Sequence, residues 1–156
     1  MQSVANTYTQ IYLQFVFAVS RRQCLIPREH KDELHRYIGG LVTRRQSKSL
    51  AIHCMPDHAH IFIGYRPTIS IPDFVKEIKV ESNEFIKSKG WISAPFNWQE
   101  GYGAFSYSKS QIGDVINYIK CQEEHHRTEK FSSEYKNILK EFDIPFEDKY
   151  LFEFFD

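Results

Sequence analysis

Residues 50–65 read LAIHCMPDHAHIFIGY, and this stretch decides the fold that the sequence predicts. Two mainly apolar runs, 50–55 and 58–65, flank Pro56 and Asp57, which favour a tight turn. The stretch therefore predicts a β-hairpin. Its second strand carries His58 and His60, so the predicted fold and the predicted chemistry meet in one segment.

Residues 10–19 form an alternating segment ahead of the hairpin. Apolar side chains occupy every second position on one face: Ile11, Leu13, Phe15, Phe17 and Val19. The other face begins with Gln10, Tyr12 and Gln14. A period of two predicts a strand, and its polar and aromatic second face suits the lining of a site.

Two helices are predicted on either side of the hairpin. Pro27 suits a first helical turn, and apolar residues between positions 34 and 42 follow helical spacing. Pro72 opens the second helix, and Gly90 follows its end as a C-cap. Residues 96–107 are aromatic and glycine-punctuated, which indicates an irregular fourth strand.

Ser108 and Gln111 have the spacing of a capping box, which predicts a third helix from 108 to about 126. A short amphipathic helix near 132–142 follows. The element order β-α-β-β-α-β predicts an α+β, ferredoxin-like (split βαβ) antiparallel sheet. We expect helices on one face, a free second face for a substrate or partner, and an extra C-terminal helix that carries Tyr118.

We assign one domain to residues 1–156, with a core at 8–107, a tyrosine-bearing helix at 108–126 and a tail at 127–156. No apolar run reaches the roughly 20 residues of a membrane helix, and the N-terminus lacks the layout of a signal peptide. The three cysteines have no disulfide-like spacing, which favours a reduced, cytoplasmic protein.

The net charge of zero gives no global argument for nucleic-acid binding, so any DNA contact needs a locally basic face. The candidate cations for that face are Arg21, Arg22, Arg44, Arg45 and Lys48.

His58 and His60 stand two residues apart on a predicted strand, so both side chains point to the same face. Their Cα atoms are then about 6.6–6.8 Å apart, which lets both imidazoles reach one metal ion. Seven histidines in 156 residues give roughly 0.3 such pairs by chance. Taken alone, the pair is equally compatible with two buried histidines that have ordinary hydrogen-bond partners.

Tyr118 and Gln122 stand four residues apart on the third predicted helix, so their side chains share one strip of its surface. A phenol with a pKa near about 10 is a poor nucleophile at neutral pH unless a cation or base assists it. A glutamine oxygen is a ligand that Mg²⁺ and Mn²⁺ accept. The alternatives are a tyrosine at the edge of the core and an exposed glutamine.

The segment Met55-Pro56-Asp57-His58-Ala59-His60, followed by Tyr118, Gln122, His125 and His126, resembles the single-tyrosine HUH transposases. These are proteins of the insertion-sequence 200/605 type, and the REP-associated tyrosine transposases are their relatives. The resemblance implies that His58, His60 and Gln122 bind Mg²⁺ or Mn²⁺. It also implies that Tyr118 attacks single-stranded DNA beside hairpins and forms a 5′-phosphotyrosine.

The resemblance further implies a homodimer in which active sites can be shared between subunits, and a prokaryotic protein that acts at the nucleoid. An alternative of another class is a non-catalytic, ferredoxin-like nucleic-acid-binding module whose sheet stacks unpaired bases. Asp57 has two interpretations, since it could orient a histidine or simply form the turn.

Overall fold

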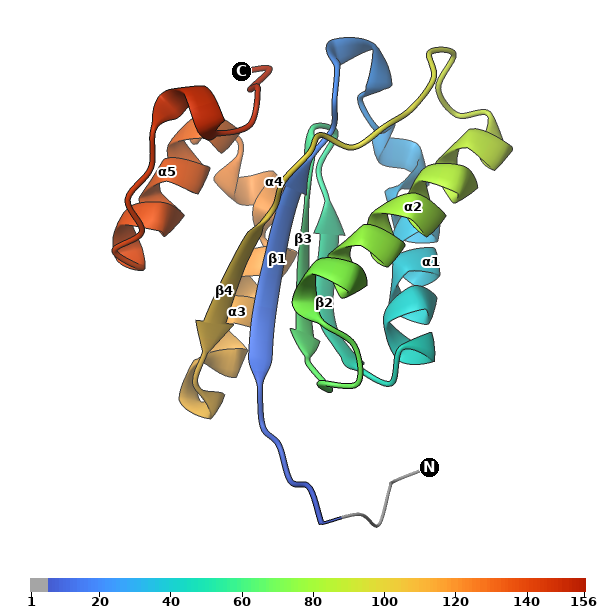
Figure 1. Cartoon of the computed structure of the whole chain (residues 1–156). Helices are drawn as coiled ribbons and strands as arrows, with labels where there is room; N and C mark the ends of the chain where they lie inside the picture. The colour runs from blue at the N-terminus through green and yellow to red at the C-terminus, as the bar shows by residue number, and fades with distance from the viewer. Residues whose placement is uncertain (1–5) are drawn as a thin grey trace.

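Four strands form one antiparallel sheet in this computed structural model, which describes residues 6–156 (Figure 1). They are β1 (Tyr12–Ala18), β2 (Lys48–Cys54), β3 (His58–Gly64) and β4 (Gly103–Tyr107), in the spatial order β2-β3-β1-β4. α1 (Lys31–Arg44) follows β1, and α2 (Ile71–Lys89) follows β3. The predicted α+β class is confirmed, and this order is compatible with the ferredoxin-like arrangement. The first five residues of the predicted domain lie outside the described residues.

Local signals set the ends of these elements. The backbone N–H of Met55 donates to the carbonyl of His58 at 2.8 Å and closes the predicted turn. The Ser70 side chain caps α2 by accepting from the backbone N–H of Asp73, and Gly90 ends that helix with φ of 66°. A left-handed residue at this position suits glycine, which has no Cβ to clash.

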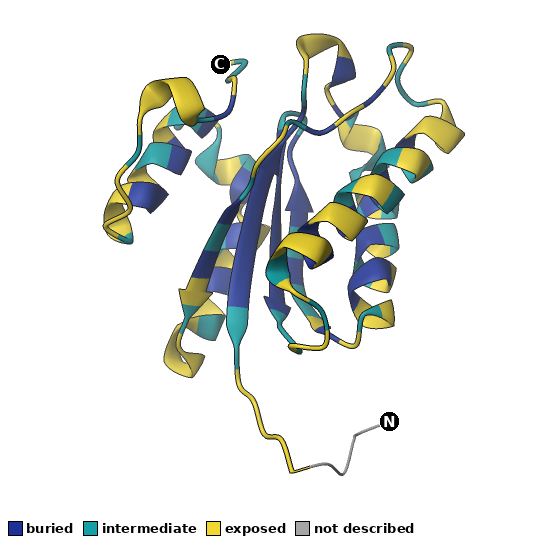
Figure 2. Ribbon diagram, viewed as in Figure 1, coloured by how far each residue is buried: buried dark blue, intermediate teal, exposed yellow. Residues whose placement is uncertain are grey.

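The first face of the sheet carries α1 and α2 and encloses the larger core (Figures 1 and 2). The apolar face of β1 points into it as predicted. Phe15 stacks on Phe74 of α2 with 5.5 Å between ring centroids, and Phe17 meets Trp98 edge to face at 4.8 Å. Burial of such rings contributes about 1.5–3 kcal/mol each and fixes the strand register.

The second face of the sheet is covered, so the prediction of a free face was wrong. α3 (Ile112–Lys120), α4 (Gln122–His125) and α5 (Phe131–Glu141) lie on this side. Val115 and Ile119 of α3 pack against Ala51 and Phe62 of the sheet in a second apolar cluster. The reason is that these helices have apolar stripes of their own, which only this face can bury.

Gly103 allows α5 to approach β4 closely. A Cβ atom at this position would lie 2.8 Å from the hydroxyl oxygen of Tyr135 and 2.8 Å from the Phe105 ring. Any larger residue would therefore push α5 away from the sheet. The regular part of the fourth strand is only Gly103–Tyr107, shorter than the predicted 96–107, and Trp98 adds one isolated bridge to Val19.

The prediction of one continuous helix from 108 to about 126 was wrong, because the structure has a 3-10 turn and two separate helices there. The capping box of Ser108 and Gln111 is present, but it opens a 3-10 turn (Lys109–Gln111) that leads into α3. α3 then ends at Lys120, and Cys121 leaves helical geometry with φ of −95° and ψ of 20° before α4 begins. The break therefore falls between Tyr118 and Gln122.

Three further 3-10 turns complete the described elements: Arg22–Cys24, Arg28–His30 and Asp148–Tyr150. No helix within residues 6–156 combines the length and the apolar character needed to cross a membrane.

His35 of α1 ties that helix to the end of β2, because its Nε2 accepts the backbone N–H of Cys54 at 2.8 Å. Burial lowers the pKa of His35 from 6.5 to about 4. Between pH 6.5 and 4, His35 is therefore protonated in the unfolded chain but neutral in the folded chain. The free energy of unfolding falls as the pH falls through this window.

We expect His35→Gln to remove part of this acid sensitivity, because an amide oxygen can accept the same N–H without titrating. After allowance for solvent screening, the group should contribute about 1–2 kcal/mol to the loss of stability by pH 4. Urea unfolding of both proteins at pH 7, 5.5 and 4.5 measures the difference. Equal pH slopes for the two proteins would refute the assignment.

Candidate active site

His58 and His60 lie on β3. Their side chains project from the second face of the sheet toward the helices that cover it, while Ala59 points into the larger core. Both imidazoles are fully buried. The ring of Phe131, from α5, stacks flat on His58 with 3.8 Å between centroids. Strand alternation thus places the two histidines side by side, as the sequence predicted, beneath a helix that it did not place there.

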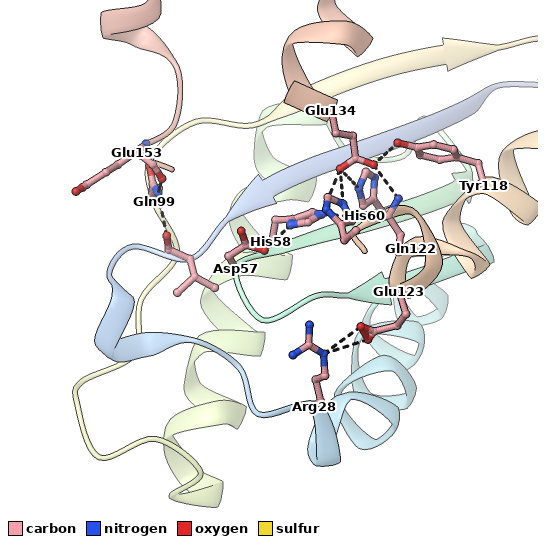
Figure 3. A network of polar contacts seen from close by, with 12 residues as sticks. Arg28, Asp57, His58, His60, Gln99, Tyr118, Gln122, Glu123, Glu134 and Glu153 are labelled. Atoms are coloured by element: carbon pink, nitrogen blue, oxygen red, sulfur yellow. Dashed lines mark hydrogen bonds and ion pairs between the residues drawn. The ribbon is translucent and has the colours of Figure 1, made fainter. Parts of the chain in front are cut away.

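Each histidine is oriented through its Nδ1 atom (Figure 3). His58 Nδ1 lies 2.7 Å from Oδ1 of Asp57, so this aspartate holds a histidine in addition to forming the turn. His60 Nδ1 lies 2.6 Å from Oε1 of Gln14, whose amide nitrogen donates to the Tyr107 hydroxyl at 2.7 Å. Since Asp57 and Gln14 present acceptor oxygens, both Nδ1 atoms donate, and both Nε2 atoms point to a common centre.

Tyr118 and Gln122 reach the same centre from α3 and α4. Gln122 Oε1 lies 3.2 Å from His58 Nε2, and the Tyr118 ring lies 6.0 Å from the His60 ring, centroid to centroid. The His125 ring stacks on Tyr118 at 4.8 Å. All four predicted site residues therefore meet within a single chain, despite the helix break between Tyr118 and Gln122.

Glu134 of α5 is the residue that the sequence reasoning missed, and it lies at the centre of the site (Figure 3). Its Oε2 accepts hydrogen bonds from the Tyr118 hydroxyl and from Gln122 Nε2, the latter at 2.8 Å. Its Oε1 lies 2.9 Å from His126 Nε2 and 3.4 Å from Nε2 of both His58 and His60.

A sequence signal for Glu134 did exist. The buried positions of α5 are Phe131, Glu134, Tyr135, Ile138 and Leu139, so one acidic residue interrupts an apolar stripe at helical spacing. Only 1% of Glu134 is exposed. A carboxylate is rarely buried unless it is paired, and so an acid within such a stripe indicates a polar partner across the interface.

The buried charges shift one another's pKa values. Burial lowers the pKa of His58, but hydrogen bonds and charge from Asp57 and Glu134 outweigh it and hold the pKa at about 9. Burial keeps the pKa of His60 below its usual value, so that histidine is neutral. Burial would raise the pKa of Glu134, yet the three surrounding imidazoles lower it far below the usual range.

The residues of this centre fit a divalent cation. Ligand atoms of His58, His60 and Glu134 all lie within 4.8 Å of one another, and all three residues are buried. His60 Nε2 is buried without a hydrogen-bond partner. His60 Nε2 lies 3.4 Å from Glu134 Oε1, and a cation between these two atoms would give the buried nitrogen a partner.

Two cavities flank the centre and differ in charge. The first, of about 410 Å³, opens beside Tyr118 and Gln14 and is lined by four carboxylates, Asp114, Glu129, Glu134 and Glu141, with no lysine or arginine among its described lining residues. The second, of about 430 Å³, lies beside Asp57, and its lining combines the cations Arg28, Arg127 and Lys130 with the carboxylates Asp57, Glu129 and Asp156.

The predicted DNA-binding cations do not form one face. Arg21 and Arg22 follow the C-terminal end of β1, whereas Arg44, Arg45 and Lys48 lie at the other end of the sheet. Arg45 forms ion pairs with Glu77 and Glu81 of α2, and Arg21 donates a hydrogen bond to the carbonyl of Pro95 at 2.9 Å.

Comparison with known proteins identifies the family. Residues 7–122 match the family model described as "Transposase IS200 like". The ISDra2 transposase TnpA of Deinococcus radiodurans is 24% identical over 120 residues, which cover 72% of this chain and 84% of that protein. The chain therefore belongs to the family of IS200-like transposases, enzymes of DNA transposition that cut and rejoin DNA.

Solved structures agree with this assignment at the level of the fold. A Deinococcus radiodurans R1 protein described as a transposase is 23% identical, with a TM-score of 0.59, and the alignment covers 78% of this chain and 98% of that one. A REP-associated tyrosine transposase bound to a REP hairpin is 16% identical, with a TM-score of 0.57 and coverage of 81% and 74%.

We expect Tyr118 to keep its proton in alkaline, metal-free solution. Burial and the negative charge of Glu134 both raise the pKa of this phenol above its usual value of 10. Phenolate absorbance at pH 10 should therefore be the same for the wild type and Tyr118→Phe, whereas Glu134→Gln should lower the pKa of Tyr118. About half a phenolate more in the wild type than in Tyr118→Phe would contradict this expectation.

Proposed function

We propose that this transposase cuts and rejoins single-stranded DNA beside hairpins, with Tyr118 as the nucleophile and a divalent metal ion held by His58, His60 and Gln122. The observation that supports this most directly is the meeting of these four side chains at one buried centre. A noncatalytic binding module would not require a phenol, two imidazoles and an amide to converge there.

The cutting step is a transesterification. The Tyr118 oxygen forms a bond to the scissile phosphorus, and the bond from phosphorus to the 3′ oxygen breaks. The products are a 5′-phosphotyrosine and a free 3′-hydroxyl, and the proton lost by the phenol balances the one gained by the 3′ oxygen. One phosphoester replaces another, so a second 3′-hydroxyl can reverse the step and rejoin the strands.

The residues of the site prepare this step. Asp57 and Gln14 fix the two imidazoles so that their Nε2 atoms face the centre. A Mg²⁺ or Mn²⁺ ion bound there would polarise the phosphate and stabilise the charge that develops on it. The acidic lining of the cavity beside Tyr118 would otherwise repel a phosphate, which is a further argument for a cation.

The DNA partner is inferred from the family, and the cations of the second cavity suggest where it lies. One solved relative is a REP-associated transposase bound to a REP hairpin, and Arg28, Arg127 and Lys130 line a cavity next to His58 and Asp57. We place the DNA backbone on this side, because the described lining of the other cavity contains carboxylates and no lysine or arginine. The homodimer stays a prediction, and because Tyr118 meets the histidines of its own chain, a dimer would not need to exchange the tyrosine.

Tyr118→Phe should abolish covalent attachment of the protein to a single-stranded DNA hairpin substrate in Mn²⁺, because the nucleophilic oxygen is removed. DNA binding should persist, since the ring and its stacking on His125 remain. Denaturing gel electrophoresis with labelled DNA measures the adduct, and a mobility shift measures binding. An adduct formed by Tyr118→Phe would show that the nucleophile is another residue.

His58→Ala should lower metal affinity and cleavage together, each by at least about tenfold, because a ligand is lost. Cleavage should be compared at limiting and saturating Mn²⁺. His53→Ala is the matched control, since His53 is the cross-strand partner of His60 but does not belong to the group of ligand atoms formed by His58, His60 and Glu134. Unchanged cleavage by His58→Ala at limiting Mn²⁺ would count against the ligand assignment.

A further inference from the structure

α5 lies outside residues 7–122, which match the family model, yet it delivers a carboxylate to the centre of the site. Burying a carboxylate is unfavourable unless hydrogen bonds and opposite charges compensate for it. The position of Glu134 in an apolar stripe therefore requires an explanation other than packing.

The two oxygens of Glu134 face different groups. Oε1 faces the imidazoles of His58 and His60, both at 3.4 Å, and His126 at 2.9 Å. Oε2 accepts from the hydroxyl of Tyr118 and from the amide of Gln122. One carboxylate thus contacts both predicted metal-binding histidines on one side and the predicted nucleophile on the other.

We propose that Glu134 is a ligand of the metal ion through Oε1 and, through Oε2, holds the Tyr118 hydroxyl beside that ion. This inference rests on the proposed function and extends it. Glu134 acts as a metal ligand and as a positioning residue for Tyr118, and His126 holds the ligating carboxylate from outside.

Charge favours this assignment. Imidazoles and an amide supply no negative charge, whereas Mg²⁺ and Mn²⁺ sites normally contain at least one carboxylate. Glu134 is the carboxylate whose ligand atom groups with those of His58 and His60 among the described residues. His60 Nε2, buried without a hydrogen-bond partner, lies 3.4 Å from the same oxygen, and a cation between them would contact both atoms.

The first test is metal binding without DNA. Glu134→Gln should weaken Mn²⁺ binding by at least about tenfold in calorimetry, and it should shrink the rise in melting temperature that Mn²⁺ produces. Glu141→Gln is the matched control, because it removes one negative charge from the same helix and the same cavity without touching the ligand atoms. Its Mn²⁺ affinity should stay within about threefold of the wild type.

A purely structural role for Glu134 predicts a different result. In that case Glu134→Gln would lower the melting temperature equally with and without Mn²⁺ and would leave the Mn²⁺ affinity unchanged. That result would overturn the inference. Should Glu134→Gln fail to fold, Glu134→Asp retains the charge that balances the buried imidazoles but withdraws the carboxylate by one methylene. Glu134→Asp should likewise bind Mn²⁺ more weakly, and wild-type affinity in this variant would also overturn the inference.

The second test concerns Tyr118. At saturating Mn²⁺, Glu134→Gln should still form the DNA adduct more slowly than the wild type, because the amide no longer holds the phenol as a carboxylate does. A full wild-type rate under these conditions would overturn the positioning role.

The two tests separate this inference from the proposed function. Loss of Mn²⁺ binding in His58→Ala but not in Glu134→Gln would overturn the role of Glu134 and leave the metal-dependent transposase standing. A wild-type protein that binds no Mn²⁺ would overturn both.

Discussion

The carboxylate of Glu134, buried among three imidazoles, is the interaction on which the second half of the structure depends. It joins α5 to β3 through His58 and His60, to α3 through Tyr118 and to α4 through Gln122. In a site of low dielectric each of these contacts is stronger than it would be in water, and each is costly to break singly. The site and the docking of α5 are therefore one cooperative unit.

The sequence predicts the first half of the structure well because its signals are local. The alternation of residues 10–19, the turn at Pro56 and the caps of α2 each depend on a few neighbouring residues, and the structure has all of them. The covered second face was not predictable in the same way. The apolar stripes of α3 and α5 are visible in the sequence, but the surface that buries them depends on contacts between distant segments, such as the approach of Tyr135 to Gly103.

The site residues also fall into those that local patterns predict and those that depend on distant contacts. The direction of His58 and His60 follows from strand geometry alone, and a four-residue spacing was enough to bring Tyr118 and Gln122 to one side. The helix break at Cys121 was missed because no proline or glycine marks it. Glu134 was missed because α5 was interpreted as an ordinary amphipathic helix, although an acidic residue in its apolar stripe was visible. Buried acids in predicted helices thus merit the attention usually given to histidine pairs.

The position of α5 also constrains how a phosphate can enter. Phe131 covers one side of His58, and Phe152 and Phe154 pack on Phe131, so that side of the imidazole is closed by apolar rings. The cavity that reaches both Tyr118 and Glu134 is acidic, whereas the cavity beside Asp57 is lined by as many cations as carboxylates. A phosphate that enters the cavity beside Tyr118 must pass four carboxylates, which a positive charge at the centre would offset. The same acidic residues that discourage phosphate in the absence of metal would raise the local concentration of a divalent cation. If the proposed metal site and nucleophile are correct, the acidic lining beside Tyr118 favours metal binding before a phosphate enters.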